Sequence, residues 1–279
     1  MKQRTSRPIG IFDSGVGGLT VMRAIIEQLP CEDLIYLGDT ARVPYGNRGA
    51  DTVRRYALNA AALLESHQIK ALVVACNTAS AYGLEALRAE LSIPVFGVIS
   101  PVARRAAEQS QSGNIAVLGT RGTIRSGAYQ RALRDLRADI YVEPLACPLL
   151  VPLAEEGWLD GVVAREVLQH YLADLSATEV DTIILGCTHY PILRDTIADV
   201  TAELMTTSTT LLDSAQATTR AVARALRESE LLNEKKEEGS RRFLLTDLPE
   251  GFVDTAERFF GRSLHRECEH VDIVDTTSS

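Results

Sequence analysis

Short apolar runs alternate with longer amphipathic segments between residues 9 and 227. A run of about four apolar residues is typical of a strand buried in a parallel sheet, and a longer segment with one apolar face is typical of a helix. This alternation predicts an α/β protein whose strands are joined by crossover helices. The predicted strands are 9–12, 34–37, 72–75, 95–98, 115–118, 140–142, 183–186 and 210–212, and the clearest helices between them are 19–29, 51–67 and 128–137. After a charged connection at 228–240, a further strand is expected at 242–247 and a last helix at 252–260.

The predicted strands form two sets whose features follow the same order. IGIFDSGVGG matches IAVLGTRGT, DLIY matches ADIY, and LVVACNT matches IILGCTH, at offsets of 105 to 111 positions. This weak repeat predicts two pseudo-symmetric, parallel-sheet α/β lobes with an active-site cleft between them. We assign residues 1–98 and 209–279 to the first lobe and residues 99–208 to the second.

A cysteine ends each of two matching apolar runs, Cys76 after LVVA and Cys187 after IILG. The carboxyl end of a parallel strand is where open α/β sheets bind their ligands. A single cysteine on an apolar run is more often an inert buried residue, but two at equivalent strand ends favour a shared function. Both precede a predicted helix start, which favours a thiolate and a bound carboxylate. The hydrogen-bonding residues that follow them are Asn77, Thr78, Thr188 and His189.

Two thiols that face one small molecule suit proton exchange at a single carbon. To invert a stereocentre without a cofactor, one group must remove the α-hydrogen from one face while another delivers a proton to the opposite face. The reverse reaction exchanges these roles, so identical groups are expected. Because a thiol has an ordinary pKa of about 8.5, a modest shift gives one thiolate opposite one thiol.

Polar residues also follow the first strand of each set. Asp13 and Ser14 precede a glycine-rich turn that could approach an anion or relay a proton, although either residue could simply cap the next helix. Thr120 and Thr123 hold the equivalent place in the second set and suit carboxylate binding, although a helix cap explains one threonine as well.

Two further segments offer candidate contacts. The loop after the second strand carries Tyr45 and Gly46, stiffened by a proline, and could reach into a cleft or be an ordinary surface loop. Glu155 could be an acid of the cleft or a solvated residue of a helix, and His189 could be a structural histidine.

Composition excludes several other classes of protein. A net charge of −8, with the basic residues scattered, argues against nucleic-acid binding. No stretch approaches the roughly 20 apolar residues needed to cross a membrane, and the first residues lack a signal peptide, so we expect no membrane partner and a cytoplasmic location. Five cysteines without a CxxC pair suggest neither disulfides nor a zinc site. Only four lysines are present, and none follows a strand, which disfavours pyridoxal phosphate.

Taken together, FDSGVGG, PYG, ACNTAS, GTRGT and GCTHYP resemble the glutamate racemases of the aspartate/glutamate racemase superfamily. The resemblance covers residues 9–191 strongly and continues more loosely to about residue 261. It implies a cofactor-independent isomerase that supplies D-glutamate for bacterial peptidoglycan and hence for cell wall biogenesis and cell shape. It also implies that Cys76 acts on the D enantiomer and Cys187 on the L enantiomer, and it leaves room for a homodimer. The implied substrate contacts are Asp13, Ser14, Tyr45, Gly46, Asn77, Thr78, Thr188 and His189, with Thr120, Thr123 and Glu155 as further polar contacts.

Three alternatives remain open from the residues alone. The same thiol pair would serve a racemase of aspartate or of another small acidic amino acid. A two-lobed binding or sensor protein could bury both thiols without using them. A metal protein could use Cys76, Cys187 and His189 as ligands.

Overall fold

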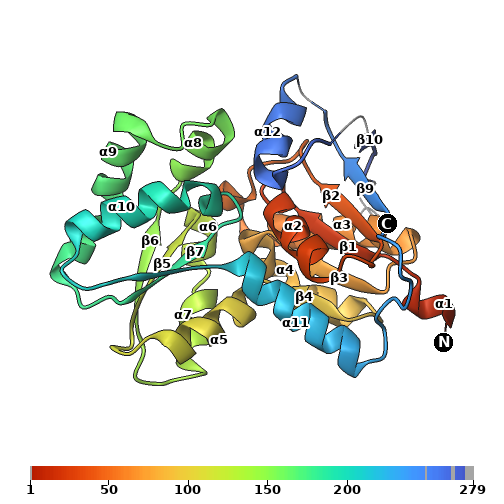
Figure 1. Ribbon diagram of the computed structural model, residues 1–279, viewed down its shortest axis with the longest axis horizontal. Helices are drawn as coiled ribbons and strands as arrows, with labels where there is room; N and C mark the ends of the chain where they lie inside the picture. The colour runs from red at the N-terminus through yellow and green to blue at the C-terminus, as the bar shows by residue number, and fades with distance from the viewer. Residues whose placement is uncertain (1, 249, 265–267, 274–279) are drawn as a thin grey trace.

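Two parallel β-sheets lie side by side in the computed structural model, which describes residues 2–248, 250–264 and 268–273 (Figure 1). The first sheet has six strands in the order β10-β9-β2-β1-β3-β4, and the second has four in the order β6-β5-β7-β8. The strands of the first sheet are β1 (Ile9–Asp13), β2 (Leu34–Gly38), β3 (Ala71–Val74), β4 (Val95–Gly97), β9 (Arg241–Leu245) and β10 (Cys268–His270). Those of the second are β5 (Asn114–Gly119), β6 (Tyr141–Ala146), β7 (Thr182–Gly186) and β8 (Thr210–Asp213).

Helices cover both faces of each sheet, as the alternating pattern predicted. Around the first sheet lie α1 (Lys2–Thr5), α2 (Leu19–Gln28), η1 (Tyr45–Asn47), α3 (Ala50–Ser66), α4 (Asn77–Glu90) and α12 (Phe252–Phe260). Around the second lie α6 (Arg121–Arg125), α7 (Ala128–Arg134), α8 (Leu150–Glu156), α9 (Gly161–Leu172), η2 (Ala173–Ala177), η3 (Tyr190–Leu193) and α10 (Arg194–Leu204). The chain passes from the first sheet to the second through α5 (Ile99–Gln109) and returns through α11 (Ser214–Glu228).

The internal repeat is confirmed by the strand order. Strands β2-β1-β3-β4 of the first sheet and β6-β5-β7-β8 of the second follow the same arrangement, so each predicted strand has its counterpart at the same place. β9 and β10 extend only the first sheet, beside β2.

The predicted lobe boundary at 208/209 needs one correction. β8 begins at Thr210 and pairs with β7, so residues up to Asp213 belong to the second sheet rather than to the first lobe. The apolar residues Leu211 and Leu212 fit this place because they pack beside the buried strand β7. The other lobe limits stay a prediction, and residues 1 and 274–279 lie outside the described part of the chain.

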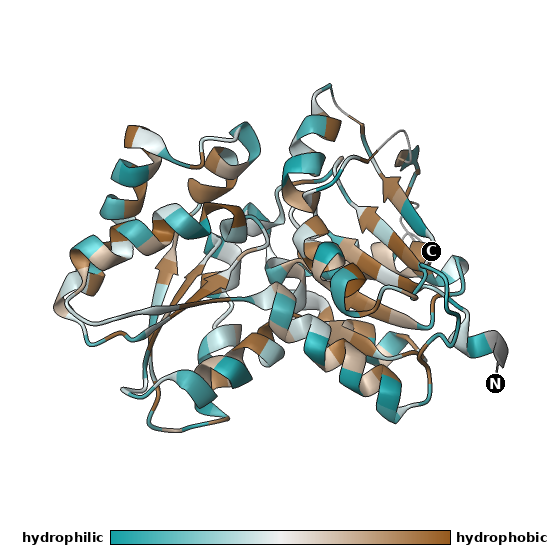
Figure 2. Ribbon diagram, viewed as in Figure 1, coloured by the Kyte–Doolittle hydropathy of each residue, from teal (hydrophilic) through white to brown (hydrophobic). Residues whose placement is uncertain are grey.

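Hydrophobic residues predominate in the sheets and on the helix faces turned toward them, while hydrophilic residues occupy the outer helix faces (Figure 2). One apolar cluster continues from the first lobe into the second. It includes Val16 and Leu19 beside β1 as well as Leu150 and Tyr190 of the second lobe. The lobes therefore share a packed apolar contact next to the loops that follow β1 and β7. No described helix is long and apolar enough to span a membrane.

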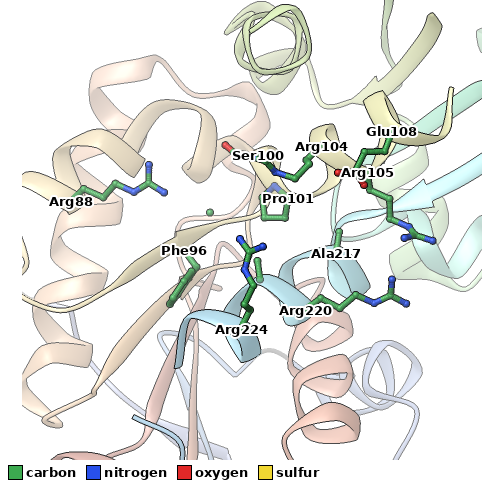
Figure 3. Close-up of a pocket in the computed structure, with 12 residues that line it drawn as sticks. Arg88, Phe96, Ser100, Pro101, Arg104, Arg105, Glu108, Ala217, Arg220 and Arg224 are labelled. Carbon is green, nitrogen blue, oxygen red and sulfur yellow. The ribbon is translucent and has the colours of Figure 1, made fainter. Parts of the chain in front are cut away.

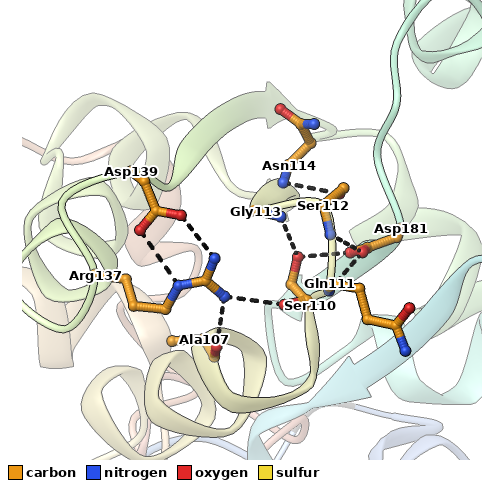
Figure 4. Close-up of polar contacts among 9 residues, drawn as sticks. All are labelled: Ala107, Ser110, Gln111, Ser112, Gly113, Asn114, Arg137, Asp139 and Asp181. Carbon is orange, nitrogen blue, oxygen red and sulfur yellow. Dashed lines mark hydrogen bonds and ion pairs between the residues drawn. The ribbon is translucent and has the colours of Figure 1, made fainter.

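A polar network fixes the amino-terminal edge of the second sheet (Figure 4). Asp181 accepts hydrogen bonds from Ser110 Oγ at 2.7 Å and from the backbone N–H groups of Gln111 and Ser112 at 2.8 and 2.7 Å. Burial alone would raise the pKa of Asp181, but the hydrogen bonds from Ser112, Ser110 and Thr182 outweigh it and lower the pKa. Arg137 donates to the carbonyl of Ser110 at 2.9 Å, so the entry from α5 into β5 is held rigidly.

Candidate active site

The candidate site forms where the chain leaves the central strands of each sheet in opposite directions. β1 lies between β2 and β3, and β5 lies between β6 and β7, so the loops after neighbouring central strands diverge. Such a switch point leaves an opening at the carboxyl ends of the strands. The loops after β1 and β3 carry Ser14 and Cys76, and those after β5 and β7 carry Thr120 and Cys187.

A cavity of about 30 Å³ lies between these loops and is shared by both lobes. Both cysteines line it, and both are buried, with 6% of Cys76 and 7% of Cys187 exposed. The full lining is Ser14, Val43, Pro44, Tyr45, Gly46, Cys76, Asn77, Thr78, Thr120, Val151, Cys187, Thr188 and His189. Most of the predicted site residues therefore lie around one cavity. Asp13, Thr123 and Glu155 do not line it, but each contacts a residue that does.

Cys76 is held at the start of α4. Its sulfur accepts a hydrogen bond from the backbone N–H of Ala79 at 3.4 Å, and its S–H donates to Ser14 Oγ at 3.6 Å. Burial raises the pKa of Cys76 to about 12, and the negative charge of Asp13 acts in the same direction. Cys76 is therefore a neutral thiol near neutral pH.

Cys187 lies beside an imidazole instead. His189 Nδ1 is 3.8 Å from the Cys187 sulfur, and Nε2 is 2.9 Å from the Glu155 carboxylate. Burial lowers the pKa of His189, but the hydrogen bonds to Cys187 and Glu155 outweigh burial and raise it to about 10. A protonated imidazole at this distance places a positive charge beside the Cys187 sulfur. The two sulfurs thus have opposite electrostatic surroundings.

Asp13 joins the two lobes behind the cavity. Its carboxylate accepts a hydrogen bond from the backbone N–H of Gly15 at 3.0 Å and one from the Thr188 hydroxyl at 3.4 Å. Burial raises the pKa of Asp13, and the positive charge of His189 opposes that shift. A carboxyl group with these neighbours can exchange a proton with the polar groups around Cys76.

Three hydroxyl groups meet on the opposite side of the cavity. Thr78 Oγ1 of the first lobe lies 2.9 Å from Thr120 Oγ1 and 3.0 Å from Thr123 Oγ1 of the second. Thr120 is also the cap of α6, so the local capping interpretation and the site interpretation both apply to it. This cluster ties the helix that begins after Cys76 to the second lobe.

Asn77 is oriented by the second lobe. Its Oδ1 accepts a hydrogen bond from the Tyr129 hydroxyl at 2.7 Å. Its Nδ2 is buried and has no hydrogen-bond partner among the described residues. A buried donor without a partner is costly, so this amide is suited to a ligand that brings an acceptor into the cavity.

The loop between β2 and α3 is part of the site rather than an ordinary surface loop. Tyr45 is buried and its hydroxyl donates to Asp39, which also accepts from Arg42 Nε at 2.7 Å. At Gly46, an added Cβ would lie 2.6 Å from the Cβ of Thr120, so only glycine lets this loop reach the second lobe. Burial and the charge of Asp39 raise the pKa of Tyr45, which keeps the phenol neutral.

Sequence reasoning missed several residues at the site. Val43 and Val151 line the cavity, and Phe259 of α12 packs its ring edge-on against His189, with 5.0 Å between the ring centroids. These residues have no polar group and follow the general apolar pattern, so no local signal distinguishes them. The segment after 252 was predicted as a helix, but not as a neighbour of the site.

An arginine-lined cavity of about 450 Å³ is a second place where a carboxylate ligand could bind (Figure 3). It lies between α5 and α11, and its basic residues are Arg88, Arg104, Arg105, Arg220 and Arg224. Its lining contains no cysteine, histidine or tyrosine. Glu108 is its one acidic residue, so the cavity lacks the pair of proton-transfer groups that inversion at a carbon needs, and the cavity with the two thiols remains the candidate active site.

No group of three or more histidine, cysteine or acidic side chains in the described ranges is placed to hold a metal ion. The set Cys76, Cys187 and His189, considered above as metal ligands, is instead arranged with the cysteines on the cavity and His189 paired with Glu155.

Comparisons with known proteins identify the family of the chain. A family model described as Asp/Glu/Hydantoin racemase matches residues 9–222. A glutamate racemase from Geobacter metallireducens is 52% identical over 258 residues, which are 92% of this chain and 94% of the relative. The crystal structure of glutamate racemase from Francisella tularensis in complex with D-glutamate has a TM-score of 0.90 at 33% identity, covering 96% of this chain and 98% of that one. Glutamate racemase from Thermus thermophilus, in complex with beta-chloro-D-alanine, has a TM-score of 0.86 at 44% identity, covering 97% of this chain and 99% of that one.

Proposed function

The chain belongs to the Asp/Glu/Hydantoin racemase family and is an isomerase that racemises glutamate, and on this premise we propose that Cys76 and Cys187 are its two proton donor/acceptors. The observation that carries the proposal is that both sulfurs line one cavity between the lobes. A racemase without a cofactor needs one base and one acid on opposite faces of the α-carbon.

The proton transfers follow from the surroundings of the two thiols. With L-glutamate, the Cys187 thiolate removes the α-hydrogen as a proton, and the Cys76 thiol delivers its proton to the opposite face of the carbanion. The products are D-glutamate, a Cys187 thiol and a Cys76 thiolate. With D-glutamate the same steps run in reverse. The protonated His189 beside Cys187, and the thiol form of Cys76, suit a resting enzyme that is ready for the L enantiomer.

Several groups are suited to hold the substrate. The unpartnered Nδ2 of Asn77 and the N-terminus of α4 can donate to a carboxylate. The remaining contacts that we propose are Ser14, Tyr45, Gly46, Thr78, Thr120, Thr188 and His189, all of which line the cavity. Tyr45 would contribute through its ring and backbone, because its hydroxyl is engaged by Asp39.

Asp13, Thr123 and Glu155 act indirectly in this proposal. Asp13 can relay a proton between Cys76 and the polar groups around it, and Glu155 keeps His189 protonated. Thr123 orients Thr78 and Thr120 through its hydroxyl. We class these three as positioning or relay residues because they do not line the cavity.

The product, D-glutamate, is used for bacterial peptidoglycan, so the chain serves cell wall biogenesis. We propose that the protein works in the cytoplasm, because two reactive thiols require a reducing compartment. None of the five cysteines, all of which lie in the described residues, forms a disulfide, and this is compatible with such a location. We also propose a homodimer, for which the exposed apolar side chains Trp158, Val162 and Val163 offer a surface at the start of α9.

Solvent exchange tests the two-thiol mechanism directly. In deuterated water, the wild type should incorporate deuterium at the α-carbon during racemisation of either enantiomer. Cys76→Ser and Cys187→Ser should each lose racemisation by at least the roughly 10²-fold expected for removal of a proton-transfer group. Cys147→Ser is the matched control, because this buried cysteine does not line the cavity. Racemisation without solvent deuterium in the product would contradict the mechanism, and activity retained in either variant would remove that cysteine from it.

A further inference from the structure

Helix α12 of the first lobe contacts the second lobe beside His189. It is nine residues long and presents Phe259 and Arg258 to the second lobe. Both residues are far in sequence from the site motifs. Their contacts converge on α8, which carries Glu155, and on the imidazole that Glu155 binds.

Arg258 caps the carboxyl end of α8. Its Nη1 donates to the carbonyl of Glu155 at 2.6 Å and approaches that of Ala154 at 3.4 Å. The last carbonyls of a helix have no partner within the helix and carry partial negative charge, so a guanidinium there is favourable. The cap is supplied by the other lobe.

Gly157 makes room for this guanidinium. It ends α8 in the left-handed conformation, with φ of 77°, and an added Cβ would lie 2.9 Å from Arg258 Cζ. The turn after α8 is therefore shaped to receive the arginine as well as to end the helix.

The surroundings explain why a positive charge is needed here. A cavity of about 560 Å³ opens between α8 and α12 and shares Val43 with the lining of the candidate active site. Its acidic lining residues are Glu155, Glu156, Glu250 and Asp254, and Arg258 is its basic one. Without Arg258, the carbonyl of Glu155 would lose its donor and face this acidic space, whereas the carbonyls of Leu153 and Ala154 accept backbone N–H groups of the turn.

We propose that Arg258 is a positioning residue for the Cys187 half of the reaction. It fixes the last turn of α8, which holds Glu155 2.9 Å from His189 Nε2, and His189 in turn lies 3.8 Å from the Cys187 sulfur. The ring of Phe259 packs against the same imidazole in a T-shaped contact. The first lobe thereby controls the base that acts on L-glutamate. This inference rests on the proposed roles of Cys187 and His189.

Arg258→Gln tests the proposal, with Arg258→Lys as the conservative variant. Arg262→Gln is the matched control because Arg262 is exposed on the segment that follows the same helix. Each variant is assayed with L- and D-glutamate, with hydrogen or deuterium at the α-carbon. Circular dichroism and thermal unfolding are recorded to compare folding.

In Arg258→Gln, kcat/KM should fall about 10-fold, less than the loss from removing a proton-transfer group itself. The fall must be equal in both directions, because the ratio of the two kcat/KM values equals the equilibrium constant, which is 1 for a pair of enantiomers. The deuterium isotope effect on kcat/KM should separate the directions. It should rise for L-glutamate, because removal of its α-hydrogen by Cys187 becomes more rate-limiting, and fall for D-glutamate. Arg258→Lys should restore most of the wild-type values, and Arg262→Gln should match the wild type.

Two outcomes would overturn the proposal. One is wild-type isotope effects in both directions in Arg258→Gln. The other is a loss of activity that accompanies a loss of thermal stability, with no rise of the isotope effect for L-glutamate and no fall for D-glutamate. Failure of the underlying mechanism would look different, because Cys187→Ser would then remain active whatever Arg258 does.

Discussion

His189 keeps its proton because two acceptors face a buried imidazole. Its pKa is raised from 6.5 to about 10, with burial acting against the shift and the bonds to Cys187 and Glu155 acting for it. Between these pH values the folded chain binds a proton that the unfolded chain has released. The interaction therefore contributes its full stability below pH 6.5 and loses it as the pH rises through about 10.

Removal of the carboxylate should weaken this pH dependence. In Glu155→Gln, the imidazole loses the ionic partner on Nε2, so its pKa should fall toward the ordinary value. We expect the free energy of unfolding to decrease less between pH 6.5 and pH 9.5 in this variant than in the wild type. Urea unfolding at several pH values measures the difference, and Glu156→Gln, one position along α8, is the control. Parallel curves for Glu155→Gln and the wild type would contradict the assignment.

At the scale of elements, the turn between β1 and α2 fits closely against the second lobe. An added Cβ at Gly17 would lie 2.6 Å from His189 Nδ1 and would also meet the Thr188 hydroxyl. Gly17→Ala should therefore displace the two residues that follow Cys187. Since a shift of roughly 1 Å can cost about 10²-fold in rate, we expect a loss of kcat/KM of that order. Gly49→Ala is the control, because an added Cβ there meets nothing within 4 Å. Steady-state kinetics of both variants decide the point, and a fully active Gly17→Ala would be the contrary result.

The elements themselves could be predicted where one local pattern determines them. The predicted bounds of β7 differ from the observed ones by one residue, and those of helix Phe252–Phe260 agree with them. A strand buried on both faces gives a continuous apolar run, and a helix buried on one face gives apolar residues at helical spacing, so both are clear in the sequence. β6 was predicted too short because Glu143 and Pro144 interrupt its apolar pattern at the edge of the sheet. Helix α7 ends earlier than predicted, at Arg134.

The site was predictable to the extent that strand ends determine it. Cys76 and Cys187 follow buried strands, and the rule for parallel sheets brings such positions together. Arg258 and Phe259 reach the site from a helix added after the repeat, through contacts that depend on how the lobes pack. No spacing in the sequence encodes that packing.

At the scale of the whole molecule, the lobes are closed over the candidate active site. The cavity of about 30 Å³ holds few water molecules and is too small for glutamate, which has ten non-hydrogen atoms. Substrate entry therefore requires the site to open, and we expect the lobes to separate at the contact between η1 and α6, where Gly46 and Thr120 meet.

Hydrogen exchange should detect this motion. With saturating D-glutamate, the amides of η1 (Tyr45–Asn47) and α6 (Arg121–Arg125) should exchange more slowly than without it, because the closed form becomes more populated. The edge of the second sheet around Asp181 is held by its own network and serves as the internal control. Unchanged exchange at η1 and α6, with substrate demonstrably bound, would contradict opening at this contact.

The matching strand orders have an evolutionary consequence. Each half of the chain contributes one sulfur from the loop after its third strand, and the order of the four strands is the same in both halves. An ancestral half-length chain that paired with an identical copy across a two-fold axis would already have presented one thiol from each side. Fusion of two such copies would let each sulfur acquire its own neighbours, an aspartate for one and a histidine for the other, so that two equivalent thiols would become chemically distinct.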